Sequence, residues 1–170
     1  MRIAAVLALL VATVSTASAD RFVSPGFSVA YGSRGFSFGV EVSAGEFMDD
    51  FPLAGGFVGG LEVSPFASSG QPWGKIYGEI EVATLIAGVG GGPALLLGNN
   101  SQFALQLTPY LALPSTMFRS ASDCWEPYVF AVPYYRYTTS NSSGGFHDVG
   151  MFGKFAWQAN GRSDNACAGH

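Results

Sequence analysis

The stretch GFSVAYGSRGFSFGVEVS, residues 26–43, decides the fold. Large apolar side chains occupy every second position on both sides of Ser33-Arg34, namely Phe27, Val29 and Tyr31 before it and Phe36, Phe38, Val40 and Val42 after it. A period of two is that of a β-strand, whose successive side chains point to opposite faces. The short polar break between the two runs is typical of a turn. The stretch therefore predicts an antiparallel hairpin with one apolar face.

The same alternation recurs along the rest of the chain, and no segment has a helical period. Beyond the two strands of this hairpin, at 27–32 and 36–43, we expect six more strands, at 57–63, 75–82, 87–98, 102–113, 128–138 and 149–158. Turns rich in Gly, Ser, Asn and Pro separate them. Such spacing is typical of an up-and-down barrel or a sandwich. The sequence therefore predicts an all-β fold, an antiparallel up-and-down β-barrel of about eight strands.

The N-terminus has the pattern of a signal peptide. Arg2 precedes an apolar run at 3–14, and Ala17-Ser18-Ala19 is the small-x-small pattern that signal peptidase cleaves. No later segment offers about 18 to 20 uninterrupted apolar residues, so no transmembrane helix is predicted. We expect a signal peptide at 1–19, a β-barrel domain at 20–158 and a C-terminal tail at 159–170.

The composition is unusual for a protein whose surface faces water. Charged residues are 12% of the chain, against roughly 25% in ordinary soluble domains. Without Arg2 the chain has seven basic and twelve acidic residues, a net charge of 7 − 12 = −5. No basic patch is present, which argues against a nucleic-acid partner. Too few charges remain for a typical water-facing shell.

The two faces of the predicted strands differ in a way that indicates which one points outward. The positions between the large apolar residues are often small, as at Ser28, Ala30, Ser37 and Gly39. Small residues suit the interior of an eight-stranded barrel, where little room is available. This favours apolar faces that point to lipid. The alternative is a secreted or periplasmic soluble barrel that binds an apolar ligand inside.

If lipid lies outside, the ionisable residues of the strands lie in the lumen, where they must pair with one another. We therefore expect a salt-bridged interior formed by Glu41, Glu62, Lys75, Glu79, Glu81, Arg136 and Lys154. Aromatic residues near strand ends are typical of the two interfacial girdles of membrane barrels. We expect a girdle formed by Trp73, Trp125, Tyr128 and Trp157. Core packing in a soluble sandwich is the alternative for these aromatic residues.

The two cysteines, Cys124 and Cys167, lie in a chain predicted to enter an oxidising compartment. A single disulfide is the plainest interpretation. Counting strands also places the two cysteines at the same end of the barrel. Two separate thiols are the alternative, and a metal site that uses Cys167 and His170 is disfavoured because two ligands do not make a site.

No motif indicates a reaction. The run 88–93, Gly-Val-Gly-Gly-Gly-Pro, lacks the Lys-Ser/Thr and the helix of a phosphate-binding loop. His147-Asp148 could contribute to a hydrolytic triad, but no G-x-S-x-G elbow is present, and adjacent residues of a strand point apart. Glu46, Asp49 and Asp50 do not form a calcium-loop motif. We therefore expect no enzymatic activity, no cofactor and no metal site.

In these features the chain resembles the small eight-stranded outer-membrane barrels, the class of the OmpA-type and OmpX-type proteins. The resemblance is carried by the signal peptide, by the segments 35–45, 74–82 and 148–157, and by the aromatic strand ends. It implies a cell outer-membrane location, membrane lipid as a partner and a monomer. It also implies a structural or surface-interaction role, with loops available to a surface partner and no wide channel. A lipid-modifying barrel enzyme is a further alternative.

Overall fold

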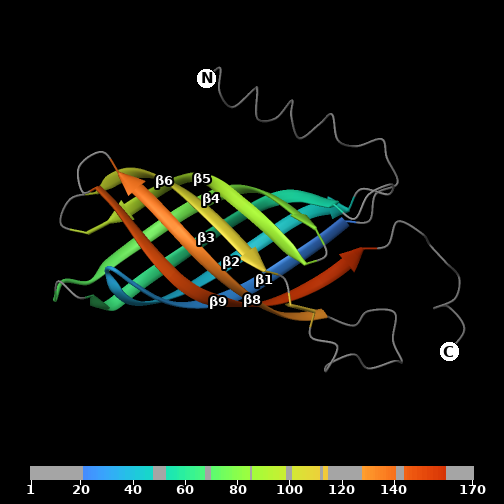
Figure 1. Ribbon diagram of the computed structural model, residues 1–170, viewed down its shortest axis with the longest axis horizontal. Coiled ribbons are helices and arrows are strands. Elements are labelled where there is room, and N and C mark those ends of the chain that lie inside the picture. Colours follow the sequence, from blue (N-terminus) through green and yellow to red (C-terminus); the bar gives the residue numbers. More distant parts are fainter. Residues whose placement is uncertain are drawn as a thin grey trace, which may run out of the picture.

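The computed structural model describes residues 21–47, 53–67, 70–84, 86–98, 101–111, 113–114, 128–140 and 144–159. Nine strands form one antiparallel sheet in this part of the chain (Figure 1). Their bounds are β1 Arg21–Gly32, β2 Gly35–Phe47, β3 Leu53–Ala67, β4 Trp73–Thr84, β5 Ala87–Leu97, β6 Gln102–Leu111, β7 Leu113–Pro114, β8 Tyr128–Ser140 and β9 Gly144–Ala159. Within the described ranges, no helix has the length and apolar character needed to cross a membrane.

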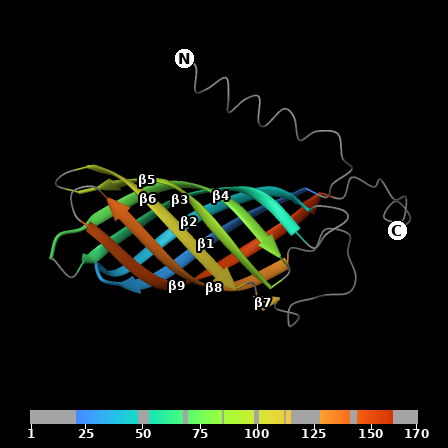
Figure 2. The ribbon, with the colours of Figure 1, turned by 45° about the horizontal axis from the view of Figure 1, so that its top comes forward.

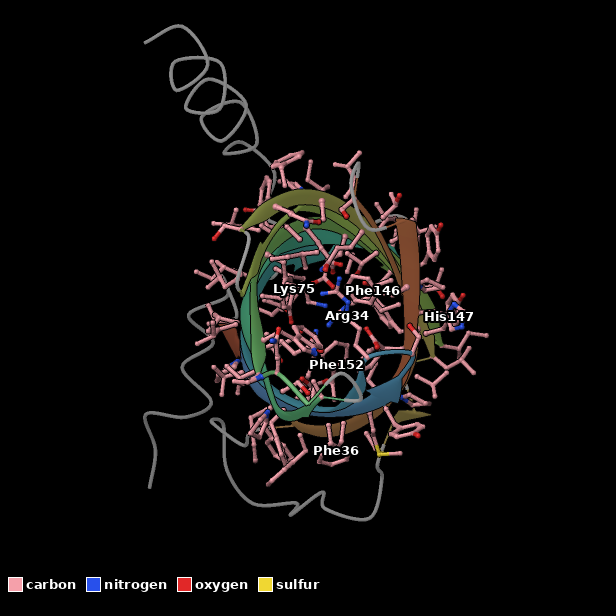
Figure 3. All side chains as sticks on the ribbon, turned by 90° about the vertical axis from the view of Figure 1, so that its left-hand side faces the viewer. Arg34, Phe36, Lys75, Phe146, His147 and Phe152 are labelled. Carbon is pink, nitrogen blue, oxygen red and sulfur yellow. The ribbon has the colours of Figure 1, made fainter. Side chains whose placement is uncertain are left out.

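The sheet closes into a barrel. The strand order is β6-β5-β4-β3-β2-β1-β9-β8-β7, and β6 also pairs with β8. The two-residue β7 pairs with β8 at Leu113 and Ala131, so it extends the pairing between β6 and β8 that closes the barrel. Eight long strands therefore enclose the lumen, which Figure 3 shows end-on. The predicted eight-stranded antiparallel barrel is confirmed.

The two ends of the barrel differ in the connections they carry (Figures 1 and 2). At one end, here called the turn end, the strands are joined through 33–34, 68–72, 98–101 and 141–143. At the other, here called the terminal end, β1 begins and β9 finishes. The tightest connection is Ser33-Arg34, where Gly35 has φ +99°, a backbone conformation that glycine adopts at no steric cost. The amide of Ser33 donates to the carbonyl of His147, 3.1 Å away, which holds this turn against β9.

Side chains alternate between an apolar outer wall and a polar lumen. Among the described residues, 27 large hydrophobic side chains are exposed, and all but Ile86 lie on the eight long strands, where they follow the period of two except at the register shift between β2 and β3. None of the residues described as exposed is Asp, Glu, Lys or Arg. The buried side chains include small residues, aromatic rings and most of the ionisable groups of the strands. The core of this protein is thus its lumen.

Strand lengths differ from the prediction where glycine interrupts the pattern. We expected the third strand at 57–63, whereas β3 spans Leu53–Ala67 and includes four glycines between residues 55 and 60. We expected the last strand at 149–158, whereas β9 begins at Gly144. A glycine contributes no side chain to either face, so alternation cannot be recognised across it although the backbone pairs normally.

Candidate functional site

The lumen contains all seven ionisable residues for which the sequence predicted an interior position. Lys75 and Arg136 are 0% exposed, Glu62 is 2% exposed, and Glu41, Glu79 and Glu81 are also buried. The side chain of Lys154 is 11% exposed. Asp148, which the sequence suggests only as a possible member of a triad, is buried with them. The period of two could have identified Asp148, because Phe152 and Lys154 of β9 occupy the same face.

Glu62 is the centre of the ion-pair network. Its Oε2 lies 2.8 Å from Lys75 Nζ and 2.9 Å from Arg136 Nη1. Its Oε1 accepts a hydrogen bond of 2.6 Å from Ser37 Oγ. Lys75 comes from the neighbouring strand, whereas Arg136 reaches Glu62 from β8, across the lumen. One carboxylate therefore links four strands, β2, β3, β4 and β8.

Arg136 extends this network toward the terminal end. Its Nε donates to Thr108 Oγ1 at 3.1 Å, and that hydroxyl donates to Glu79 Oε1 at 2.6 Å. Gln106 Nε2 donates to the same oxygen of Glu79 at 2.6 Å. A continuous chain of polar contacts thus runs from Glu62 to Glu79 and gives each of these buried side chains at least one polar partner. Arg136 Nη2 and Gln106 Oε1 have no hydrogen-bond partner among the described residues.

A second group lies nearer the terminal end. Lys154 Nζ lies 2.8 Å from Glu41 Oε1 and donates to Ser43 Oγ at 2.9 Å. Tyr77 Oη donates to Glu41 Oε2 at 2.8 Å. Tyr110 Oη donates to Glu81 Oε2 at 3.0 Å. Phenol groups therefore complete the hydrogen bonding of carboxylates that have fewer cationic partners.

Aromatic rings separate the cations along the lumen, an arrangement we call the cation–aromatic ladder. Arg34 Cζ lies 4.1 Å from the Phe146 ring and 5.6 Å from the Trp73 ring. Lys75 Nζ lies 6.0 Å from the same two rings and 5.5 Å from Tyr77. The remaining contacts are Arg136 Cζ at 4.6 Å from Tyr77, 4.8 Å from Tyr134 and 5.4 Å from Phe152, and Lys154 Nζ at 5.2 Å from Phe152 and 5.9 Å from Tyr110. Neighbouring cations share rings, so the contacts are continuous; Figure 3 shows Arg34, Lys75, Phe146 and Phe152 inside the barrel.

Three tyrosines of the lumen each lie over a glycine of the adjacent strand. The cross-strand pairs are Tyr77 with Gly60, Tyr110 with Gly88, and Tyr134 with Gly150. A methyl group at any of these glycines would overlap the ring opposite it. We call them the tyrosine–glycine pairs. They let large rings lie in a lumen that has little spare width.

Two residues of the glycine-rich run 88–92, Gly88 and Gly90, have the same explanation. The run forms part of β5, a regular strand. Gly88 makes room for Tyr110, and a Cβ at Gly90 would lie 2.6 Å from Glu79 Oε2. These glycines therefore accommodate interior side chains, and the structural context of a phosphate-binding loop is not found here.

The predicted aromatic girdle is only partly described. Trp73 lies on the inward-facing row of β4, with its ring 6.1 Å from Phe146, so it lies on the lumen side and not on the outer wall as we expected. Tyr128 and Trp157 belong to β8 and β9, but their side chains lie outside the described residues, as do Trp125, Cys124 and Cys167. The disulfide therefore stays a prediction. At the turn end, the exposed rings of the described residues include Tyr31, Phe36 and Phe66, which are cross-strand neighbours, and Phe103.

The remaining candidates for chemistry do not converge. His147 is exposed on the outer wall, where Figure 3 shows it, and its ring lies 6.3 Å from that of Tyr135. Asp148, its neighbour, is buried on the opposite face. Asp49 and Asp50 lie outside the described residues. Within the described ranges, no three His, Cys, Asp or Glu side chains are grouped so that they could hold a metal ion.

Comparisons with known proteins find similarity in structure only. No family model and no curated protein matches the sequence. Among solved structures, neisserial surface protein A (NspA) is similar with 12% identity and a TM-score of 0.40, over 82% of this chain and 97% of that one. Ail, the attachment invasion locus protein of Yersinia pestis, is similar with 12% identity and a TM-score of 0.41, over 83% and 99% of the two chains.

A second structure of Ail, in complex with the heparin analogue sucrose octasulfate, has 12% identity and a TM-score of 0.40, over 83% of this chain and 99% of that chain. These proteins are small eight-stranded outer-membrane β-barrels. Because the identities and TM-scores are low, no residue role is transferred from them. The fold assignment rests on the closed eight-stranded sheet itself.

Proposed function

We propose that the chain is a non-enzymatic outer-membrane β-barrel protein with a structural or surface-interaction role and a filled, salt-bridged lumen. In this proposal residues 1–19 direct export and the barrel domain inserts as a monomer. The proposal rests chiefly on one observation: the described strands expose 26 large hydrophobic side chains and no charged one, while most of their ionisable side chains lie inside.

The energetics of the outer wall support a lipid surrounding. A closed barrel satisfies its backbone hydrogen bonds internally, which hydrocarbon requires. A lysine or arginine on the lipid face of such a barrel costs about 2–4 kcal/mol at the bilayer midplane. In water the same wall would be a continuous apolar surface, whereas monomeric soluble proteins rarely expose large apolar patches. The absence of exposed charge among the described residues is therefore expected for lipid and unfavourable for water.

The contents of the lumen argue against the soluble alternative. A barrel that stores an apolar ligand needs an apolar cavity. Here the interior contains ion pairs, hydroxyl groups and the cation–aromatic ladder. Such an interior is also too full for a wide aqueous channel. These observations support a barrel that functions through its presence in the membrane or through its surface.

Membrane fractionation tests the proposal. The full chain, produced in a Gram-negative host, should be recovered in the outer-membrane fraction, resist extraction by urea, and migrate faster on gels when it is not heated. Recovery as a soluble monomer without detergent would contradict the proposal and favour the secreted or periplasmic alternative. A lipid conversion that is lost in His147→Ala would instead favour an enzyme.

A further inference from the structure

The outer wall has a hollow of about 390 Å³ at the turn end, where β3, β4 and β5 lie side by side (Figure 1). Gly74 of β4 lies at its centre, and we call it the Gly74 hollow. The direct cross-strand neighbours of Gly74 are Val63 of β3, which is exposed on the outer wall, and Leu97 of β5. Pro65 and Pro72 line the hollow next to the connection 68–72. The hollow therefore exists because the middle of three strands has no side chain at this level.

The lining of the hollow is apolar. None of the eight residues that line it has an ionisable side chain. Ser64 is 0% exposed, and its hydroxyl donates to the carbonyl of Phe36 at 2.6 Å. Trp73 lines the hollow from the lumen side, and its Nε1 is buried. These side chains therefore offer an occupant no exposed hydrogen-bonding group, which suits a hydrocarbon and not an ion, a sugar or a peptide backbone.

The width of the hollow suits a single extended chain. Neighbouring strands lie about 4.8 Å apart, so the backbones of β3 and β5 are separated by roughly 9–10 Å. Val63 and Leu97 stand on the two sides of this gap, and the convex wall of a second barrel could not enter between them. Ile76, the next outward residue of β4, is 49% exposed, so the hollow is continuous with the apolar outer wall. A hydrocarbon chain that lies along this wall can enter the hollow without crossing a polar surface.

We propose that the Gly74 hollow holds one acyl chain of a membrane lipid, from the leaflet around the turn end. The inference rests on the proposed function, since only a barrel in a bilayer has acyl chains along this wall. An unfilled hollow leaves its lining atoms without van der Waals partners on one side. Between apolar surfaces in a membrane such packing, and not the hydrophobic effect, drives association. The hollow therefore holds an acyl chain more firmly than the convex remainder of the wall does.

The test uses the fluorescence of Trp73 with a brominated phospholipid as the probe. Replacing Trp125 and Trp157 by Phe in the full chain leaves Trp73 as the single tryptophan. The protein is inserted into phosphatidylcholine vesicles in which part of the lipid carries bromine, a short-range quencher, on its acyl chains. Because the ring of Trp73 lies on the lumen side, acyl chains come close to it only through the hollow. Bromolipid should therefore quench Trp73.

Two glycines of the same strand provide the variant and its matched control. A Cβ at Gly74 would lie 3.6 Å from its nearest neighbour, the carbonyl oxygen of Glu62, which is an ordinary contact. Gly74→Leu should therefore fill the hollow and remove most of the quenching. Gly78 also points outward, the nearest atom to its Cβ position is 3.9 Å away, and it does not line the hollow. Gly78→Leu should leave the quenching unchanged.

Flotation with the vesicles and gel migration are measured first, so that two failures can be distinguished. A chain that does not float contradicts the proposed function and with it this inference. A folded chain that floats but whose Trp73 is not quenched, or is quenched equally in Gly74→Leu, overturns the hollow alone. A brominated free fatty acid, added at the same bromine content to vesicles of plain lipid, should quench no more strongly than the bromolipid. Stronger quenching by the fatty acid would overturn membrane lipid as the occupant.

Discussion

Gly60 and Tyr77 show how single residues determine the packing of this lumen. They face each other across β3 and β4, and the ring of Tyr77 occupies the space where a Cβ of residue 60 would lie. Gly59, the next residue, points outward and has no neighbouring atom within 4 Å of its Cβ position. Two adjacent glycines of the same strand therefore have opposite tolerance to substitution.

Gly60→Ala should lower the free energy of unfolding by about 1–3 kcal/mol, because the added methyl group overpacks the lumen against the Tyr77 ring. Gly59→Ala should be neutral or stabilise the fold by about 0.4–1 kcal/mol through the unfolded chain. Urea unfolding of both variants in the same lipid or detergent measures the difference. Equal effects would show that the Tyr77 ring can move aside and that the pair does not constrain the lumen.

Glu62→Gln should be the most damaging substitution of an ionisable residue in the lumen. It leaves Lys75 and Arg136 buried without their shared carboxylate, and removing one partner of a buried pair costs about 3–5 kcal/mol. Glu81→Gln is the matched control, since among the described residues Glu81 has no ion pair within 4 Å and accepts from Tyr110; its loss should cost about 1 kcal/mol. Unfolding curves of both variants and of Glu62→Gln with Lys75→Gln measure the effect. The double variant should recover part of the loss if the pair is coupled.

At the scale of the strands, most of the fold could be predicted from the period of two. The pattern gave the eight strands and placed the ionisable residues on one face, because large apolar and small or charged residues alternate cleanly in β2, β4 and β6. The predicted positions of the strand ends were less accurate wherever glycines interrupt the alternation, as in β3. Trp73 was assigned to a girdle by its place at a strand end, whereas the phase of Lys75, two residues later, puts it on the lumen side.

The contacts within the lumen could not be predicted from the sequence. Arg136 pairs with Glu62, 74 residues away in the chain, although Asp148 is its direct cross-strand neighbour. Which carboxylate it reaches depends on how the barrel closes and on how far each side chain extends across the lumen. The period of two shows which face of the sheet a side chain points to. It does not show which side chains of a strand on the far side of the lumen lie at the same level along the barrel axis.

A charge on the outer face of one strand should distinguish lipid from water around the barrel. Val40 is 59% exposed and points outward from β2. If the wall faces lipid, Val40→Arg should reduce folding into lipid vesicles and destabilise the protein by up to about 2–4 kcal/mol, whereas Val40→Leu should not. Folding yield, followed by heat-modifiable migration, measures this. Unchanged or improved yield for Val40→Arg would indicate that this face is in water.

At the scale of the whole molecule, the two ends of the barrel should lie on opposite sides of the membrane. Both described chain ends are at the terminal end, so export through the inner membrane and insertion from the periplasm would leave the turn end outside the cell. A cysteine at Ser33, with Cys124 and Cys167 replaced by Ser, should therefore react with a membrane-impermeant maleimide on intact cells. A cysteine at Thr84, at the terminal end, should react only after the cells are broken. The reverse pattern would show the opposite orientation.

The tyrosine–glycine pairs also fix the register of the strands, and through it the diameter of the barrel. They lie on three different seams, β3 with β4, β5 with β6, and β8 with β9. Sliding one strand by two residues keeps every side chain on its face, yet it would place Tyr77 opposite Val58 or Glu62, where no space is left for the ring. For a fixed number of strands, the stagger summed around the ring sets the diameter. An insertion of two residues within one of these strands would therefore change the stagger and with it the diameter of the barrel. The present lumen side chains would not pack correctly in a barrel of another diameter.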